Sequence, residues 1–187
     1  MNDLEAAVGE AAAVFESLGI PYMLIGGLAV SAWGEPRATL DADFTVWTEP
    51  DDFERTVLRL CESFQGLTRD PIEFARSARV LPVRSAQGTR MDIVFGSLPW
   101  EREAIARAQQ KELSGKNVTV ASVEDLIVMK LFSEREKDAD DARRLLIRFG
   151  RELDQGYLEP LLTSLADSLA RPEILEVWRN TSGGSGL

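Results

Sequence analysis

The chain has 187 residues, of which 44% are hydrophobic and 28% charged, and this predicts one globular domain or one domain with a small helical appendage. Its formal net charge of -10 argues against broad, salt-dependent coating of nucleic acid, because that binding needs many Lys and Arg on one face. One Cys and no His exclude an internal disulfide and a Cys- or His-rich metal cluster, so any metal should be an oxygen-liganded ion such as Mg²⁺ or Mn²⁺.

The first two thirds of the chain alternate between helical and strand patterns, which predicts an α/β core. Apolar runs of strand length are separated by Gly and Pro, and acids at the start of several segments favour helix N-termini. The expected elements, in chain order, are a helix at 3–18, a strand at 22–25, a helix at 28–33, a strand at 40–47, a helix from 51 to about 65, strands at 80–84 and 90–95, a helix beginning at Pro99 and a strand at 116–120.

After residue 121 the pattern becomes entirely helical. Ser122 begins a variant of the capping box, which predicts a helix N-terminus there. Helices are then expected at 126–132, 138–149, 154–170 and 172–179. We therefore predict an α/β core at 1–121, a C-terminal helical part at 122–180, and a flexible tail rich in Gly and Ser at 181–187.

Asp41 and Asp43 lie one residue apart in the second expected strand. The 13 Asp of the chain make about one such pair expected by chance, and Asp138 and Asp140 repeat the spacing in a helical segment. In a strand, however, residues two apart leave the same face, so both carboxylates are in reach of one cation. A solvated sheet face, or pairing with Arg37, explains the two acids equally well.

A third acid makes a metal site the better interpretation. Asp92 lies in the run 91–95, which is otherwise apolar, and an ionised carboxylate in a central strand is costly unless a cation or donors compensate it. Leu40, Ala42 and Phe44 are expected on the opposite, core-facing side of the earlier strand. If the two strands are neighbours, three like charges meet, and a divalent metal would neutralise them.

Gly26 and Gly27 end the first strand and open a helix. Without side chains they allow backbone amides to approach a phosphate, and a helix N-terminus favours negative charge. A tight turn is the more common reason for such a pair. Beside three acids on neighbouring strands, the pair indicates a place for a metal-bound triphosphate.

The order of these motifs resembles the nucleotidyltransferase superfamily typified by DNA polymerase beta. That family has a Gly-Gly or Gly-Ser pair that opens a helix after a strand, then Asp-x-Asp on the next strand and a third Asp on a later one. The matching residues here are Gly26, Gly27, Asp41, Asp43 and Asp92. The resemblance implies an antiparallel or mixed sheet core flanked by helices, with a C-terminal helical part that closes over the nucleotide.

A further pattern looks most like the bacterial AbiEii-type nucleotidyltransferases, which are the toxins of toxin-antitoxin pairs. Their R-x-T-x-D-x-D form places Arg37 and Thr39 ahead of the two aspartates. Their helical K...R.KD..D block is matched by Lys130, Arg135, Lys137, Asp138 and Asp141. The resemblance covers about residues 20 to 150.

These resemblances imply roles for the individual residues. Asp41, Asp43 and Asp92 would hold Mg²⁺ or Mn²⁺, with an NTP as substrate and pyrophosphate as the leaving group. Gly26 and Gly27 would bind the phosphates through their amides. Four further residues would help to bind the nucleotide: Arg37, Thr39, Asp138 and Asp141. Arg37 and Thr39 are alternatively ordinary strand-entry residues, and Asp138 and Asp141 alternatively start and cap their helix. Lys130 would neutralise charge on the leaving group, and its alternative is a snorkelling lysine on a buried helix.

The acceptor and partners stay open. RNA, a small molecule such as an aminoglycoside, and a role with an antitoxin protein are all compatible with the motifs. Residues 69–90 carry five Arg against two acids and form a candidate basic rim for a phosphate-bearing ligand, or an ordinary solvated face. A degenerate module that binds nucleotide or a partner without turnover is the competing class. No stretch approaches the roughly 20 apolar residues of a membrane span, and the acidic N-terminus is unlike a secretory signal, so a cytoplasmic protein without a membrane partner is expected.

Overall fold

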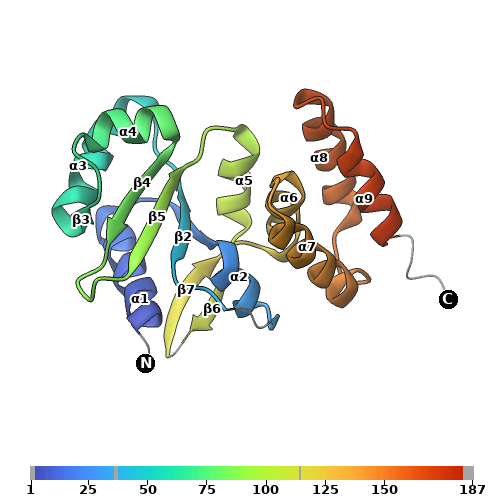
Figure 1. Cartoon of the computed structure of the whole chain (residues 1–187), viewed down its shortest axis with the longest axis horizontal. Helices are drawn as coiled ribbons and strands as arrows, with labels where there is room; N and C mark the ends of the chain where they lie inside the picture. The colour runs from blue at the N-terminus through green and yellow to red at the C-terminus, as the bar shows by residue number, and fades with distance from the viewer. Residues whose placement is uncertain (1–2, 36–37, 114, 183–187) are drawn as a thin grey trace. The chain divides into compact units, whose positions relative to one another are not determined.

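A computed structural model describes residues 3–35, 38–113 and 115–182 of the chain. The chain divides into two compact units, Met1–Ala121 and Ser122–Leu187 (Figure 1). The first unit contains a β-sheet with helices, whereas the second is helical in its described residues. None of the described helices is both long enough and apolar enough to span a membrane.

In its described residues, the first unit is built on a mixed sheet of seven strands in the order β3-β4-β5-β2-β1-β7-β6. Neighbouring strands are antiparallel, except that β1 pairs with β7 and β2 pairs with β5 in parallel. The strands are β1 (Tyr22–Ile25), β2 (Ala42–Val46), β3 (Gln65–Gly66), β4 (Val80–Arg84), β5 (Arg90–Phe95), β6 (Gln109–Leu113) and β7 (Lys116–Val120). The predicted mixed α/β class is therefore confirmed.

Helices connect and cover the strands of this sheet. They are α1 (Asp3–Leu18), α2 (Gly26–Ala32), the 3-10 turn η1 (Pro50–Asp52), α3 (Phe53–Ser63), α4 (Pro71–Ala78) and α5 (Pro99–Arg107). Phe15 of α1 is fully buried and packs edge-on against Phe44 of β2, with ring centroids 5.2 Å apart. Phe44 thus faces α1, and because side chains alternate along a strand, Asp43 faces the other side of the sheet.

The start of β2 differs from the expected strand at 40–47. Residues 40 and 41 form a bend, and the ladder begins only at Ala42. Ala42 and Phe44 are fully buried as expected, but Leu40 is 92% exposed, so its expected place in the core is wrong. Side-chain alternation requires extended backbone, and Leu40 lies before the point where pairing with β1 and β5 imposes it.

Three elements of the first unit were not expected from the sequence: α4, β3 and β6. Asp70 caps α4 by accepting a hydrogen bond from the backbone N–H of Glu73 at 3.0 Å, and Pro71 occupies the first turn. Helix α4 ends at Arg79, which adopts a left-handed conformation with φ of 58°. The basic segment 69–90 therefore contains α4 in addition to the expected strand, which is β4.

The second unit consists of α6 (Val123–Phe132), α7 (Glu136–Phe149), α8 (Gln155–Ser168) and α9 (Glu173–Ser182). Ser122 caps α6, and its hydroxyl donates to Asp125 at 2.7 Å. Asp125 is fully buried, and the Tyr157 hydroxyl of α8 donates to it at 2.6 Å. Helix α9 continues to Ser182, so the tail predicted from residue 181 does not begin there, and residues 183–187 lie outside the described residues.

Candidate metal and nucleotide site

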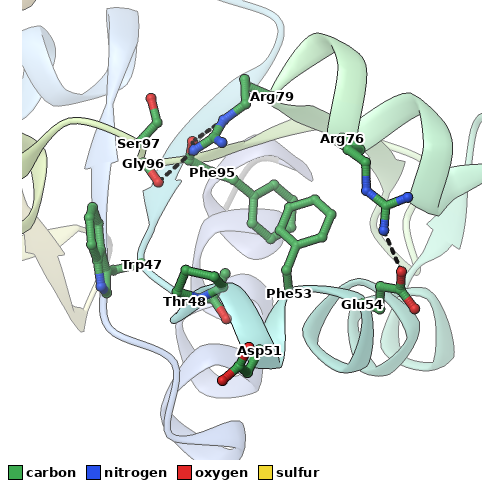
Figure 2. A pocket seen from close by; sticks show the side chains of 11 residues that line it. Trp47, Thr48, Asp51, Phe53, Glu54, Arg76, Arg79, Phe95, Gly96 and Ser97 are labelled. Carbon is green, nitrogen blue, oxygen red and sulfur yellow. Dashed lines mark hydrogen bonds and ion pairs between the residues drawn. The ribbon is translucent and has the colours of Figure 1, made fainter.

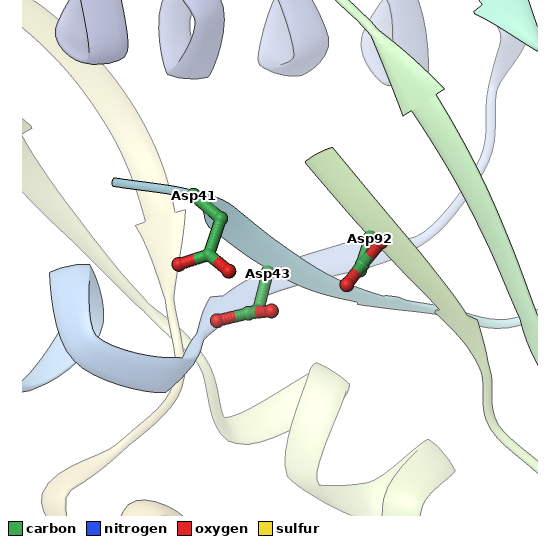
Figure 3. A group of neighbouring side chains, drawn as sticks. All are labelled: Asp41, Asp43 and Asp92. Atoms are coloured by element: carbon green, nitrogen blue, oxygen red, sulfur yellow. The ribbon is translucent and has the colours of Figure 1, made fainter. Parts of the chain in front are cut away.

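Three carboxylates converge on one face of the sheet in the first unit. Asp43 is on β2, Asp92 is on the neighbouring strand β5, and Asp41 directly precedes β2. One oxygen from each side chain lies within 4.8 Å of the others. In Figure 3 the three side chains point away from the helix that lies on the opposite side of β2.

Strand pairing produces this convergence. Strands β2 and β5 are parallel and in register, with Asp43 directly opposite Asp92. Partners in register project to the same face of a sheet. The apolar neighbours of Asp92, Met91 and Ile93, are fully buried on the other face. On both strands, the acidic residues therefore point to one face of the sheet and their apolar neighbours point to the other.

Each outer member of the triad has a polar partner. The Thr39 hydroxyl donates to an Asp41 carboxylate oxygen at 3.0 Å and so fixes the orientation of that side chain. Arg90, two residues before Asp92, donates to both of its oxygens at 3.2 Å. Arg90 belongs to the basic segment 69–90, but its contact with Asp92 was not expected from the sequence. Its spacing of two from Asp92 within a strand was the signal, because such residues share a face.

Gly26 lies directly beside the triad. It follows Ile25, the residue of β1 that pairs with Asp43, and it begins α2 with φ of 69°. A Cβ placed on Gly26 would lie only 2.1 Å from the Oδ2 atom of Asp43. Because Gly26 has no side chain, the Asp43 carboxylate can occupy this space. Gly27, the next residue of α2, is buried.

The donor set fits a hard divalent cation. Three carboxylate oxygens are the ligand type that Mg²⁺ and Mn²⁺ prefer, and the described residues add neither thiolate nor imidazole to the group. Asp43 and Asp92 are partly buried, so water screens their mutual repulsion less than it would on an open surface. A bound cation would relieve that repulsion, and the triad can also accept the proton of a bound hydroxyl group.

Lys130, Asp138 and Asp141 belong to the second unit. Lys130 of α6 makes an ion pair with Asp138 of α7 and a second one with Asp141, at 3.1 Å to its Oδ2. All three side chains are nearly buried, and the Ser133 hydroxyl donates to the other oxygen of Asp138 at 2.6 Å. The cluster joins α6 to α7. Ser133 was not considered in the sequence analysis.

Other residues of the matched motifs lie elsewhere or are not described. Arg37 lies outside the described residues. Arg135 and Lys137 are exposed at the start of α7. Asp140, the chance-spaced partner of Asp138, is exposed and pairs with Arg143 at 3.2 Å.

A pocket of about 490 Å³ lies at the opposite end of β2 and β5 from the triad (Figure 2). Trp47, Phe53 and Phe95 line it, with Phe53 and Phe95 in ring contact at 4.9 Å. The Arg79 guanidinium donates to the backbone oxygens of Phe95 and Gly96, at 3.0 and 2.8 Å. Trp47 is four residues beyond Asp43, or about 13 Å along a strand. This pocket is therefore separate from the carboxylates, and no sequence motif indicated it.

No protein-family model matches the chain, and no curated protein sequence matches it. Solved structures do match. The crystal structure of ANT(2'')-Ia in complex with adenylyl-2''-tobramycin has a TM-score of 0.59 and 16% identity, over 90% of this chain and 99% of that one. A nucleotidyltransferase-like protein from Paracoccidioides brasiliensis has a TM-score of 0.54 and 19% identity, over 94% and 91%.

A third solved structure matches a smaller share of this chain. The lincosamide antibiotic adenylyltransferase LnuA, bound to lincomycin, has a TM-score of 0.52 and 14% identity, over 78% of this chain and 96% of that one. The three structures share a fold with this chain over most of its length, although their sequences have diverged far from it. The chain therefore has the nucleotidyltransferase fold.

Proposed function

We propose that the protein is a metal-dependent nucleotidyltransferase, which moves an NMP from an NTP to a hydroxyl group and releases pyrophosphate. The observation that carries the proposal is the convergence of Asp41, Asp43 and Asp92 within 4.8 Å on the sheet of this fold. A fold can host unrelated activities, so the activity is argued from the site rather than from the fold. Clustered carboxylates are costly without a cation and useful with one.

In this proposal Asp41 and Asp43 hold the cation against the triphosphate, and Asp92 completes a second cation site beside the acceptor hydroxyl. When bound, the divalent cation neutralises phosphate charge and makes the hydroxyl easier to deprotonate. Thr39 keeps the Asp41 carboxylate oriented through its 3.0 Å hydrogen bond. The amides of Gly26 and Gly27 bind the phosphates at the start of α2.

The reaction makes one bond and breaks one bond. The acceptor oxygen bonds to the α-phosphorus, and the bond from that phosphorus to the oxygen bridging to the β-phosphorus breaks. The hydroxyl proton passes to Asp92 or to water, and the negative charge that develops leaves with pyrophosphate. Orienting the reactants and compensating this charge are the contributions expected of a phosphoryl-transfer site.

Lys130 is proposed to neutralise the charge on the leaving pyrophosphate, with Asp138 and Asp141 holding its side chain. Their ion pairs with Lys130 support the holding role. The same contacts also fit a purely structural link between α6 and α7. The two roles predict different results for the variants described in the Discussion. Arg37, which lies outside the described residues, is proposed to bind the nucleotide as well.

The acceptor is a second part of the proposal. A small hydroxylated molecule is one candidate, because ANT(2'')-Ia and LnuA, whose solved structures include an adenylylated tobramycin and a bound lincomycin, match this chain over 90% and 78% of its length. An RNA acceptor, as for a toxin controlled by an antitoxin, is the other candidate. The described residues and these structures give no specific support for a toxin or an antitoxin.

Transfer and binding by Asp variants test the proposed function. We expect Asp41→Asn and Asp43→Asn to abolish incorporation of labelled NTP and to remove the rise in melting temperature that Mg²⁺ with NTP produces. Both variants should fold, because removing one of three like charges relieves repulsion in the protein without metal. Asp140→Asn is the matched control, since Asp140 is exposed and makes a surface ion pair with Arg143. Full activity of either triad variant would overturn the proposal.

A further inference from the structure

Two arginines extend the triad's face of the sheet toward β4. Strands β4 and β5 are antiparallel, and Arg84 lies directly opposite Arg90 in their register. Arg90 shares a face with Asp92, which it contacts at 3.2 Å, and directly opposed residues of an antiparallel pair project to the same face. Arg84 and Arg90 therefore lie together beside the third carboxylate of the triad.

The local charge of this arginine pair is only partly compensated. Like charges directly opposite each other in a sheet disfavour pairing. Arg90 pairs with one carboxylate, that of Asp92. Arg84 donates to the backbone oxygen of Gly88 at 2.8 Å, and this neutral acceptor does not compensate the charge of Arg84. Both side chains are exposed, and that of Arg90 retains 56% of its accessible surface. Two guanidinium groups thus offer donors toward solvent at the Asp92 side of the carboxylate triad.

The hairpin that carries the pair is anchored. The carboxylate of Glu10 on α1 accepts a hydrogen bond from the backbone N–H of Ala86, at 3.1 Å. The Thr89 hydroxyl donates to the backbone oxygen of Asp3 at 3.2 Å. Both contacts hold the turn between β4 and β5 against α1. The arginine pair is therefore presented from a fixed scaffold, which reduces the conformational entropy lost when a ligand binds.

We propose that Arg84 and Arg90 bind a phosphate group of the acceptor, so that the acceptor is a phosphate-bearing molecule. This inference rests on the proposed function, in which the acceptor hydroxyl lies against Asp92. A group that reaches Asp92 also comes close to Arg90, because the two side chains are in contact. Guanidinium groups bind phosphate with paired hydrogen bonds, and a second one across the strand adds to that binding.

The net charge of -10 is spread over the whole chain, whereas the charges of the arginine pair act locally. Exposed charges further apart than about 8 to 10 Å are largely screened at physiological salt. Arg90 contacts Asp92 at 3.2 Å and is therefore within that range of the proposed attacking group, and Arg84 lies directly opposite Arg90. In the proposed function the bound cation compensates the carboxylate triad. A cationic acceptor such as an aminoglycoside would then meet the two positive charges of the pair, whereas a phosphate would compensate them.

Direct binding tests the inference without turnover. The probe is a fluorescein-labelled RNA oligonucleotide with a free 3′-hydroxyl, titrated at several salt concentrations. We expect Arg84→Gln to weaken its binding about tenfold and to lower the salt slope by about 0.7 for the lost phosphate contact. Arg84 is the preferred position, because its guanidinium donates to Gly88 rather than to the triad.

The matched control is the double variant Arg55→Gln with Arg59→Gln, on exposed positions of α3. It removes two positive charges, whereas Arg84→Gln removes one, so a general effect of net charge would be larger in the control. The control should bind the RNA as the unmodified protein does. Equal weakening in Arg84→Gln and the control would overturn the inference, as would unchanged binding in Arg84→Gln.

Competitors distinguish the possible sources of the phosphate. If uridine 5′-monophosphate displaces the RNA as effectively as an unlabelled oligonucleotide does, the acceptor is a small phosphorylated molecule. If only the oligonucleotide displaces the RNA, the acceptor is a nucleic acid. Tobramycin that competes better than either would overturn the inference in favour of a cationic acceptor.

If the unmodified protein neither binds Mg²⁺ with NTP nor transfers NMP, the proposed function fails. The RNA titration still decides the role of the arginines in that case.

Discussion

Gly26 combines two requirements at one residue. Its φ of 69° is a conformation that L residues adopt at a cost of about 1–2 kcal/mol, and a Cβ would displace the Asp43 carboxylate at 2.1 Å. We expect Gly26→Ala to lower the free energy of unfolding by about that amount and to abolish the stabilisation by Mg²⁺ with NTP. Thermal melts with and without the ligand measure both effects.

Gly88 provides the control for backbone strain alone. Its φ is 84°, but a Cβ there would have no neighbour within 4 Å. Gly88→Ala should lose similar stability and keep the full response to Mg²⁺ with NTP. An equal loss of that response in both variants would show that strain, and not the displaced Asp43, is the cause.

Thr39 is predicted to act through Asp41 rather than on the substrate. Thr39→Val removes the hydroxyl that donates to the Asp41 carboxylate and keeps the shape of the side chain. We expect the affinity for Mg²⁺ or the transfer rate to fall about 10 to 100-fold, as is usual when a hydrogen bond to a metal ligand is lost. Thr39→Ser keeps the hydroxyl and should therefore retain most of the affinity for Mg²⁺ and of the transfer rate. Failure of Ser to do so would mean that the methyl group, and not the hydrogen bond, matters.

At this scale, alternation along strands allowed the positions of Asp43 and Asp92 to be predicted from sequence. The same rule failed for Leu40, because it applies only where neighbouring strands hold the backbone extended, and β2 begins at Ala42. The cross-strand pairing of Arg84 with Arg90 needed the register, which a single sequence does not contain. Individual carboxylates were therefore more predictable than the residues around them.

The link between α6 and α7 depends on balanced charge. Lys130→Met would leave Asp138 and Asp141 buried without their cation, and breaking such a cluster typically costs about 3–5 kcal/mol. The triple variant Lys130→Met, Asp138→Asn and Asp141→Asn removes all three charges and should recover most of this stability. Urea denaturation of the three proteins measures the difference.

The triple variant also separates the two roles of Lys130. If Lys130 neutralises the leaving pyrophosphate, the folded triple variant should remain at least about tenfold slower in transfer, the scale of one charge-assisted contact. If it only joins the helices, transfer should return along with stability. The second result would remove Lys130 from the nucleotide site and leave the carboxylate triad unaffected.

The elements with a clear period of hydrophobic residues were predicted from the sequence, whereas the strands β3 and β6 and the helix α4 were missed. The apolar runs of β1 and β5 and the amphipathic α3 and α7 show their structure locally. Strand β6 has the sequence Gln-Gln-Lys-Glu-Leu, and it is a strand because β7 pairs with it at the edge of the sheet. For α4, the Asp70-Pro71 start was a valid signal that was overlooked.

At the scale of the whole molecule, the two units allow separate tests of the proposed roles. The triad lies in the first unit, so Mg²⁺ with NTP should stabilise that unit by about 2.7 kcal/mol at a hundredfold excess over Kd. Lys130 lies in the second unit, which should be stabilised as well if Lys130 binds the nucleotide. Trp178 is the one tryptophan in residues 122–187. Fluorescence of Trp178→Phe therefore follows the first unit, while circular dichroism follows the helices of both. A ligand-induced shift confined to the first unit would exclude Lys130 from the nucleotide site.

The in-register pairing of β2 with β5 also has a consequence for how the protein folds. These parallel strands are separated in sequence by α3, β3, α4 and β4, so Asp43 and Asp92 meet only after a long loop has closed. During synthesis the acidic cluster cannot exist until the chain has been made through β5. The entropy cost of loop closure and the repulsion between the carboxylates both oppose the pairing of β2 with β5. Burial of the apolar residues on the opposite face of the two strands must outweigh both costs. The centre proposed for catalysis is thus assembled by the hydrophobic side of the same two strands.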